Sequence, residues 1–159
     1  MSVIDTLIAD RTQADVTRWG KLQEKEFSAM TAAEQAEWLS GPKGAYNPAK
    51  DMNRVEGAVS YLAQLLAGYG YIVTVAPKTD WAVGDEPTLA QLERYRADVA
   101  AIRGAIGTFN TTPATPTAMD KLTWQQANAI EQILLDVEAM IHLLEKTWFY
   151  SGEIYAGEV

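Results

Sequence analysis

The chain has 159 residues, no cysteine, one histidine, and 21 acidic against 13 basic side chains, giving a formal net charge of −8. This length corresponds to about one domain, and a hydrophobic content of 48% is typical of a globular protein. The lack of cysteine excludes disulfides, thiolate metal sites and cysteine nucleophiles. The acidic balance argues against a nucleic-acid partner, because phosphate binding depends on clustered Lys and Arg.

The N-terminal segment shows no targeting signal. It lacks a basic region followed by an apolar stretch, and Asp5 and Asp10 interrupt its hydrophobic residues. No apolar run approaches the 18 or so residues that a membrane-spanning helix needs. We therefore expect a protein that is made in a reducing cytoplasm and has no membrane partner.

Apolar periodicity and N-cap residues predict five helices. Thr31, Thr88 and Thr123 each begin a capping box, in which a Thr is followed three residues later by Glu or Gln. Thr12 is the expected N-cap of the first helix. The predicted helices cover residues 12–27, 31–40, 48–68, 88–107 and 123–149.

One short segment is typical of a β-strand. Residues 71–75 read YIVTV, between Gly70 and Pro77, which predicts a strand near 71–76. The Thr- and Pro-rich residues 107–122 predict a linker. The sequence thus predicts a mainly α, five-helix bundle-like single domain over residues 1–149 with a minor β element, followed by an extended or strand-like tail over 150–159.

Three of the predicted helices can be aligned on one another without gaps. The third, fourth and fifth share apolar positions at the same alternating spacing of three and four residues. In this alignment Asn53 is equivalent to Asn128 and Glu56 to Glu131. Two interpretations stay open, an internal repeat and the general tendency of amphipathic helices to align. The fifth helix has a wider apolar arc, typical of a central helix or of one that meets another subunit.

Catalytic chemistry has little support in the sequence. His142 lies between Ile141 and Leu143 late in a predicted helix, where a solvated histidine is the ordinary case. Three acidic residues, Asp80, Asp85 and Glu86, crowd one loop, and such a group could serve glycoside hydrolysis or bind a hard cation. Since acids in a polar loop are usually solvated, we predict no catalytic residues, no cofactor and no metal.

The C-terminal tail is the least usual stretch. Its sequence YSGE at 150–153 is repeated as YAGE at 155–158. An extended segment with aromatic side chains can add a strand to a neighbouring sheet edge. The alternatives are an intramolecular clasp and an arm that reaches another subunit. The large apolar residues that we predict to form an interaction site are Trp148, Phe149, Tyr150, Ile154 and Tyr155.

Four segments of the chain form a distinctive set of motifs. They are DRTQADV at 10–16, KDMNRVE at 50–56 with Tyr61 following, KTDWAVGD at 78–85, and the ending WFYSGEIYAGE at 148–158. Together they resemble a family of small uncharacterised proteins from the tail and baseplate region of phages and prophages of Gram-positive bacteria. The resemblance spans nearly the whole chain and implies synthesis in a bacterial cytoplasm.

The resemblance implies a structural component of the virion, in the tail or baseplate region, that acts by protein–protein assembly and not as an enzyme. Its expected partners are other virion or tail proteins, in a homo-oligomer or a heteromeric assembly, and its expected final location is the virion. The alternative is a phage-encoded soluble module that binds or regulates a host protein. An enzyme using the Asp80, Asp85 and Glu86 loop is a distant third.

The acidity is concentrated in the C-terminal third of the sequence. From Thr111 to Val159 there are two Lys and no Arg against seven acidic residues, so this stretch carries −5 of the net −8. A partner surface of basic character is the corollary, since charge complementarity sets association rate and register.

Overall fold

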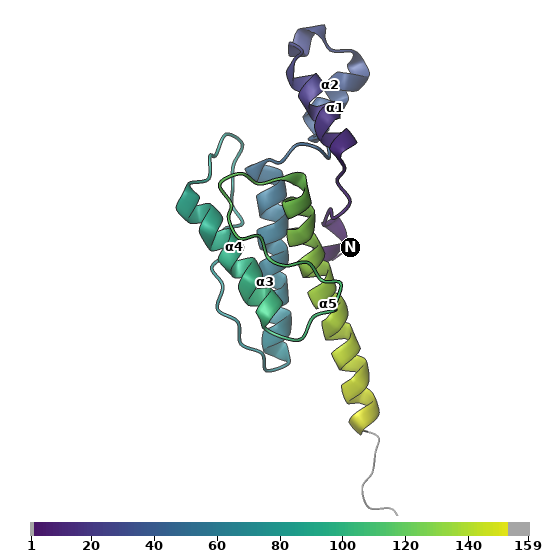
Figure 1. The fold of residues 1–159 in the computed structure, drawn as a ribbon, viewed down its shortest axis with the longest axis vertical. Helices are drawn as coiled ribbons and strands as arrows, with labels where there is room; N and C mark the ends of the chain where they lie inside the picture. The colour runs from purple at the N-terminus through teal and green to yellow at the C-terminus, as the bar shows by residue number, and fades with distance from the viewer. Residues whose placement is uncertain (1, 153–159) are drawn as a thin grey trace, which may run out of the picture.

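The computed structural model describes the backbone of residues 2–152 and the side chains of residues 2–147, and within this part the protein is mainly α (Figure 1). The α-helices of the described part are α1 (Gln13–Gln23), α2 (Ala32–Ser40), α3 (Asn53–Gly68), α4 (Leu89–Gly104) and α5 (Trp124–Gly152). Two 3₁₀ turns, η1 (Ile4–Thr6) and η2 (Phe27–Ala29), and a π-helical turn, η3 (Pro48–Met52), complete the elements. The mainly α, single-domain prediction is confirmed.

The helix starts follow the capping signals of the sequence. In α2 and α4 the side chains of Thr31 and Thr88 accept from the backbone three residues on, and Glu34 and Gln91 return the bond. At the start of α5 the Thr123 hydroxyl accepts from the Gln126 N–H at 3.2 Å, and the Thr123 N–H donates to the Gln126 side chain at 2.9 Å. These bonds satisfy N–H groups that a helix N-terminus otherwise leaves unpaired.

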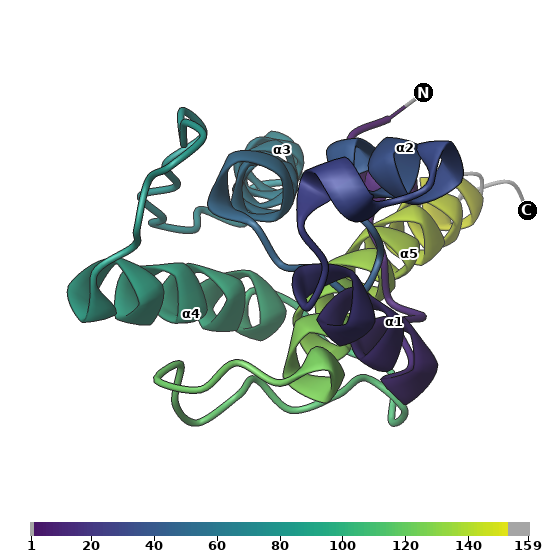
Figure 2. The same ribbon diagram turned by 90° about the horizontal axis from the view of Figure 1, so that it is seen from above.

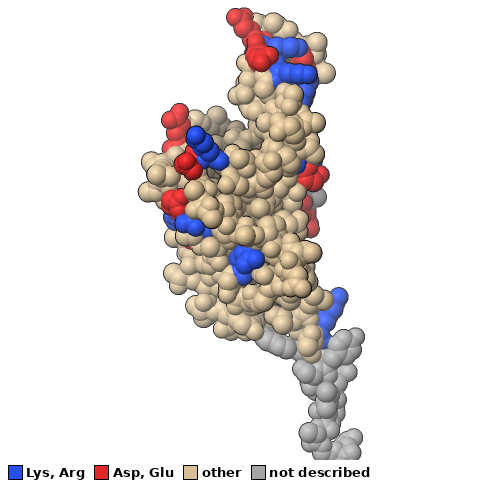
Figure 3. Space-filling model, viewed as in Figure 1, with Lys and Arg blue, Asp and Glu red and all other residues tan. Residues whose placement is uncertain are grey.

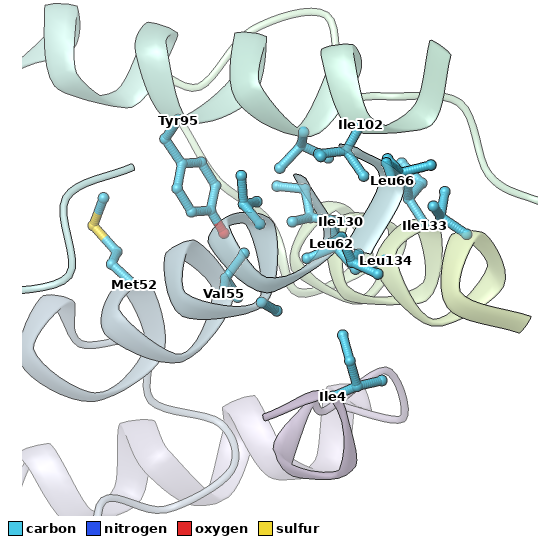
Figure 4. Close-up of a cluster of buried hydrophobic side chains, with 14 of the residues drawn as sticks. Ile4, Met52, Val55, Leu62, Leu66, Tyr95, Ile102, Ile130, Ile133 and Leu134 are labelled. Carbon is cyan, nitrogen blue, oxygen red and sulfur yellow. The ribbon is translucent and has the colours of Figure 1, made fainter. Parts of the chain in front are cut away.

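Helices α3, α4 and α5 form a three-helix bundle around one hydrophobic core (Figure 2). The aligned apolar stripes of the three helices face one another, as Figure 4 shows for Leu62, Ile102 and Ile130. Ile4 from η1 enters the same core from the N-terminal segment. Each fully buried aliphatic side chain of this kind contributes about 1.5–3 kcal/mol. Each of the helices α3, α4 and α5 packs on the other two, and α3 also packs on η3.

Helices α1 and α2 form a hairpin that stands above one end of the bundle (Figure 1). Its small interior includes Leu22 and Met30, and the half-buried rings of Trp19 and Trp38 lie 4.7 Å apart. The hairpin returns to the bundle through a turn that packs on the start of α1. A Cβ atom at Gly44 would lie 2.1 Å from the backbone oxygen of Asp15, so only glycine fits there.

The predicted strand near 71–76 is wrong, because no β-strand occurs within residues 2–152. Residues 71–75 have no regular secondary structure and pair with no strand of the described chain. Val73 and Val75 pack against the core instead, while Ile72 is 81% exposed. The β-rich composition therefore reflects a segment that lies flat on the bundle, and a two-stranded pairing would be marginal in any case.

The expected extended tail differs from the structure in its first residues. Helix α5 continues to Gly152, so residues 150–152 are helical, whereas residues 153–159 lie outside the described part. None of the helices that the structure describes is long and apolar enough to cross a membrane.

Candidate functional site

Two groups of polar side chains on the helices each bind the main chain of a segment that has no regular secondary structure. We call Asn128 and Glu131 of α5, with Arg54 of α3, the α5 clamp. Asn128 accepts from the backbone N–H of Arg11 at 3.1 Å and donates to the backbone carbonyl of the same residue at 2.8 Å. Glu131 accepts from the backbone N–H of Ile8 at 2.5 Å. The α5 clamp therefore fixes the N-terminal segment by its main chain at two points three residues apart.

The second group, Asn53 and Glu56 of α3 with Arg94 of α4, is the α3 clamp. Asn53 accepts from the backbone N–H of Trp81 and donates to its carbonyl, both at 2.9 Å. Glu56 accepts from the backbone N–H of Lys78. This is the same set of bonds, again to two residues three apart, so the equivalent Asn and Glu residues of the sequence alignment do equivalent work.

An arginine from a neighbouring helix completes each clamp. Arg54 donates to both oxygens of Glu131, at 3.1 and 2.8 Å, and Arg94 donates to both oxygens of Glu56, at 2.6 and 3.1 Å. Such bidentate pairs fix the relative orientation of the two side chains and are stronger than a single hydrogen bond. The side chain of the clamped residue also reaches the glutamate, through the Arg11 guanidinium at 2.8 Å in one clamp and the Trp81 indole at 2.9 Å in the other.

The charges of the α5 clamp form a closed, buried set. The side chains of Arg11, Asp51, Arg54 and Glu131 are 3%, 5%, 8% and 1% exposed, and the two positive charges balance the two negative ones. Burial disfavours the charge on Arg54, but the hydrogen bonds and charges of Glu131 and Asp51 outweigh it and raise the pKa of Arg54. A buried pair of this kind depends on every partner, because one removed carboxylate leaves an uncompensated charge.

The charges of the α3 clamp are closer to solvent. Glu56 is 1% exposed, but the Arg94 side chain is 25% exposed. The hydrogen bond and charge of Glu56 raise the pKa of Arg94. Asp98 lies 3.3 Å from Arg94 and accepts from the Ala76 N–H. Burial raises the pKa of Asp98, and the Ala76 hydrogen bond and the Arg94 charge oppose that shift.

The half-buried Tyr46 and the buried Tyr95 connect the α5 clamp to α4. The hydroxyls of Tyr46 and Tyr95 lie 2.8 Å apart, and the Arg11 guanidinium lies 5.7 Å from the centre of the Tyr46 ring. Burial raises the pKa of both tyrosines. Both hydroxyls are therefore neutral, and their role is to satisfy each other in the core.

A cavity of about 350 Å³ lies beside the α5 clamp, between the start of α1 and the start of α5. Its lining includes Arg11, Val16, Tyr46 and Trp124. Nε of Arg11 is buried without a hydrogen-bond partner among the described residues. At the rim, Gln125 is exposed, so solvent reaches the opening.

The acidic loop does not form a joint site. Asp80 is exposed and pairs with Lys78 at 2.7 Å, and this neighbour lowers the pKa of Asp80. Asp85 instead accepts from the Ala82 N–H at 2.8 Å within a turn, and Glu86 is exposed. Across the described residues, no group of three or more His, Asp and Glu side chains could hold a metal ion. His142 is exposed and lies 2.8 Å from Glu145.

The predicted interaction residues sit at the far end of α5. Trp148, Phe149 and Tyr150 belong to the last turns of this helix, and Ile154 and Tyr155 lie outside the described part, so their contacts stay a prediction. The sequence analysis found the paired Asn and Glu residues but missed Arg11 and the other clamp partners. The signal for them was their place in the motifs of the sequence, which contain Arg54 (KDMNRVE), Arg11 (DRTQADV), and Lys78 and Trp81 (KTDWAVGD).

Comparisons with protein-family models, with curated proteins and with solved structures gave no match to this chain.

Proposed function

We propose that this protein is a structural component of a phage or prophage particle, in the tail or baseplate region, and that it acts by protein–protein assembly. The observation that carries the proposal is the course of α5. From Ile141, a buried core residue, the helix continues to Gly152, which is about 16 Å of further helix. Leu143 on this stretch is 46% exposed, and the aromatic sequence of the tail follows it.

The bonding of the two clamps supports a structural role for the protein. Glu56 and Glu131 both bind donors of the same chain, from backbone N–H groups and from arginines. Their buried charge thus fixes two segments without regular secondary structure on a helical bundle. A body held in this way presents its outer surfaces in a defined arrangement, which is what an assembly component needs.

The outer surfaces fit the same role. The bundle face that Figure 3 shows carries few charged side chains, whereas the α1–α2 hairpin carries both signs. Near the far end of α5, Glu138 and Glu145 flank His142, with Lys146 beside them, and the sequence from Thr111 to Val159 carries −5 of the net charge. We therefore expect a virion or tail protein with a basic surface as the partner at this end, since complementary charge guides encounter and register.

The test is quantitative mass spectrometry of purified particles from the phage or induced prophage that encodes the chain. The proposal expects this protein at a fixed copy number per particle, unchanged by a high-salt wash that removes loosely bound cytoplasmic proteins. A deletion of the gene should give particles with incomplete tails. Intact particles that lack the protein overturn the proposal.

A further inference from the structure

Two features of complementary chemistry lie at opposite ends of the molecule. The cavity beside the α5 clamp includes residues from the first turn of α5, at the end of the bundle that carries the hairpin. Gly152, at the other end of α5, leads into a segment that contains Ile154 and Tyr155. Figure 1 shows that α5 runs the length of the bundle between these two ends.

We propose that the cavity binds Tyr155 of a second copy of this chain, so that copies join head to tail. The proposal rests on the assembly function proposed above and names the partner for one of its surfaces. It also assigns the role of an arm, not of an intramolecular clasp, to the C-terminal tail.

The cavity suits a tyrosine better than an anion. Tyr46 and Trp124 supply aromatic walls and Val16 an apolar one, within a volume of about 350 Å³. The charge of Arg11 is already balanced by Glu131 and Asp51. A tyrosine brings an apolar ring for these walls and a neutral hydroxyl for the polar lining residues Gln13, Thr123 and Gln125.

The tail cannot reach the cavity of its own chain. From Ala127, which lines the cavity, to Gly152 the rise of α5 is about 37 Å. Tyr155 comes three residues after Gly152, and three extended residues span at most about 11 Å. The occupant must therefore come from another molecule.

A contact between two different surfaces of the same protein is heterologous, and it generates rings or filaments according to its rotation. Each copy offers one tail and one cavity. Blocking the tail in one variant and the cavity in another therefore leaves each variant with one intact half, which provides a sharp test.

The experiment uses full-length chains and size-exclusion chromatography with light scattering. Tyr155→Ala removes the tail anchor. Val16→Phe fills the cavity, and Gln125→Trp blocks its exposed rim as a second variant that disturbs packing less. Tyr71→Ala, an exposed tyrosine elsewhere on the protein, is the matched control. Circular dichroism shows that each variant is folded.

Wild type and Tyr71→Ala should rise above the monomer mass of 17.5 kDa in a concentration series. The series should reach about 1 mM, where a complex with a 1 mM dissociation constant still forms. Tyr155→Ala and each folded cavity variant should weaken association more than about tenfold, as expected for a buried aromatic anchor. An equimolar mixture of Tyr155→Ala with a cavity variant should give a one-to-one dimer that grows no further.

Three results overturn the inference: a wild type that stays monomeric throughout the series, a Tyr155→Ala variant that associates like wild type, or a mixture that stays monomeric. The last result also identifies a contact between identical surfaces. None of these results depends on whether the protein occurs in purified particles, so failure of the head-to-tail contact is distinguishable from failure of the assembly function.

Discussion

The α3 clamp and the α5 clamp make the same main-chain bonds and differ in the charges that complete them. Each uses an Asn to bind both backbone groups of one residue and a Glu to bind the N–H of the residue three before it. In the α5 clamp, the Glu then meets two buried arginines. In the α3 clamp, the Glu meets one partly exposed arginine and a neutral indole.

The difference in charge and burial between the clamps accompanies a difference in the sequence separation of the groups that each clamp joins. The α3 clamp closes short loops, with 22 to 28 residues between its partners. The α5 clamp joins groups 117 to 123 residues apart, and so ties the N-terminal segment to the last helix. Closing a longer loop costs more entropy. The comparison teaches that one recognition unit is used twice, with the more charged and more buried version at the more distant junction.

The largest effect is expected from Glu131→Gln. The substitution leaves Arg11 and Arg54 with Asp51 as their remaining buried carboxylate, so the free energy of unfolding should fall by about 3–5 kcal/mol. Urea unfolding followed by circular dichroism measures the change. Glu86→Gln in the exposed loop is the control and should change stability by less than about 0.5 kcal/mol. An equally small effect at Glu131 would contradict the account of the α5 clamp.

Glu56→Gln should cost less, about 1–3 kcal/mol in the same unfolding experiment. Arg94 is 25% exposed and turns to water when its partner loses charge, and the amide oxygen of Gln still accepts one hydrogen bond. The informative result is which of the two substitutions, Glu131→Gln or Glu56→Gln, lowers the free energy of unfolding more. A larger loss at Glu56 than at Glu131 would reverse the comparison of the clamps.

Local signals in the sequence predicted the helices well, and long-range pairing was beyond them. Thr31, Thr88 and Thr123 each act within three residues, so their capping boxes are visible in the sequence and occur in the structure. The equivalence of Asn53 with Asn128 was visible too, because the two residues occupy the same position when the helices are aligned. Their partners were not, since nothing local connects Asn128 to Arg11.

The wrong strand has a physical reason of the same kind. The composition of residues 71–75 favours a strand, but the segment has no regular secondary structure. A strand also needs a partner, which local composition does not encode. Here Val73 and Val75 are stabilised by the bundle core instead.

Trp81→Phe tests how much the hydrogen bond of the Trp81 indole contributes to stability, apart from the packing of its ring. Phenylalanine keeps most of the buried ring but removes the indole N–H that donates to Glu56 at 2.9 Å. Arg94 still binds the same carboxylate, so the loss should be about 1 kcal/mol. The midpoint of urea unfolding measures it. A loss as large as that of Glu56→Gln would mean that the indole, not Arg94, is the main partner of this carboxylate.

The smallest expected effect is a pH dependence at Asp98 beside the α3 clamp. Burial raises the pKa of Asp98, so the folded state holds its proton more tightly than the unfolded state, and acidification favours folding at this residue. Asp98→Asn lacks this gain. The stability of Asp98→Asn relative to wild type should therefore fall as the pH is lowered from 7 towards about 4.

Asp80→Asn is the control with the opposite sign. Lys78 lowers the pKa of Asp80, so the wild type loses this small stabilisation on acidification and the variant does not. The stability of Asp80→Asn relative to wild type should rise slightly over the same range. Parallel trends in the two variants would show that Asp98 is not held as described.

Amide hydrogen exchange of the wild-type protein, followed by nuclear magnetic resonance, tests the central claim most directly. The N–H groups of Ile8, Arg11, Lys78 and Trp81 lie in segments without regular helix or strand, and the clamps bind all four. The account predicts that these four amides exchange at least about a hundredfold more slowly than in an unstructured peptide. Exchange at the rate of an unstructured peptide at Ile8 and Lys78 would contradict it.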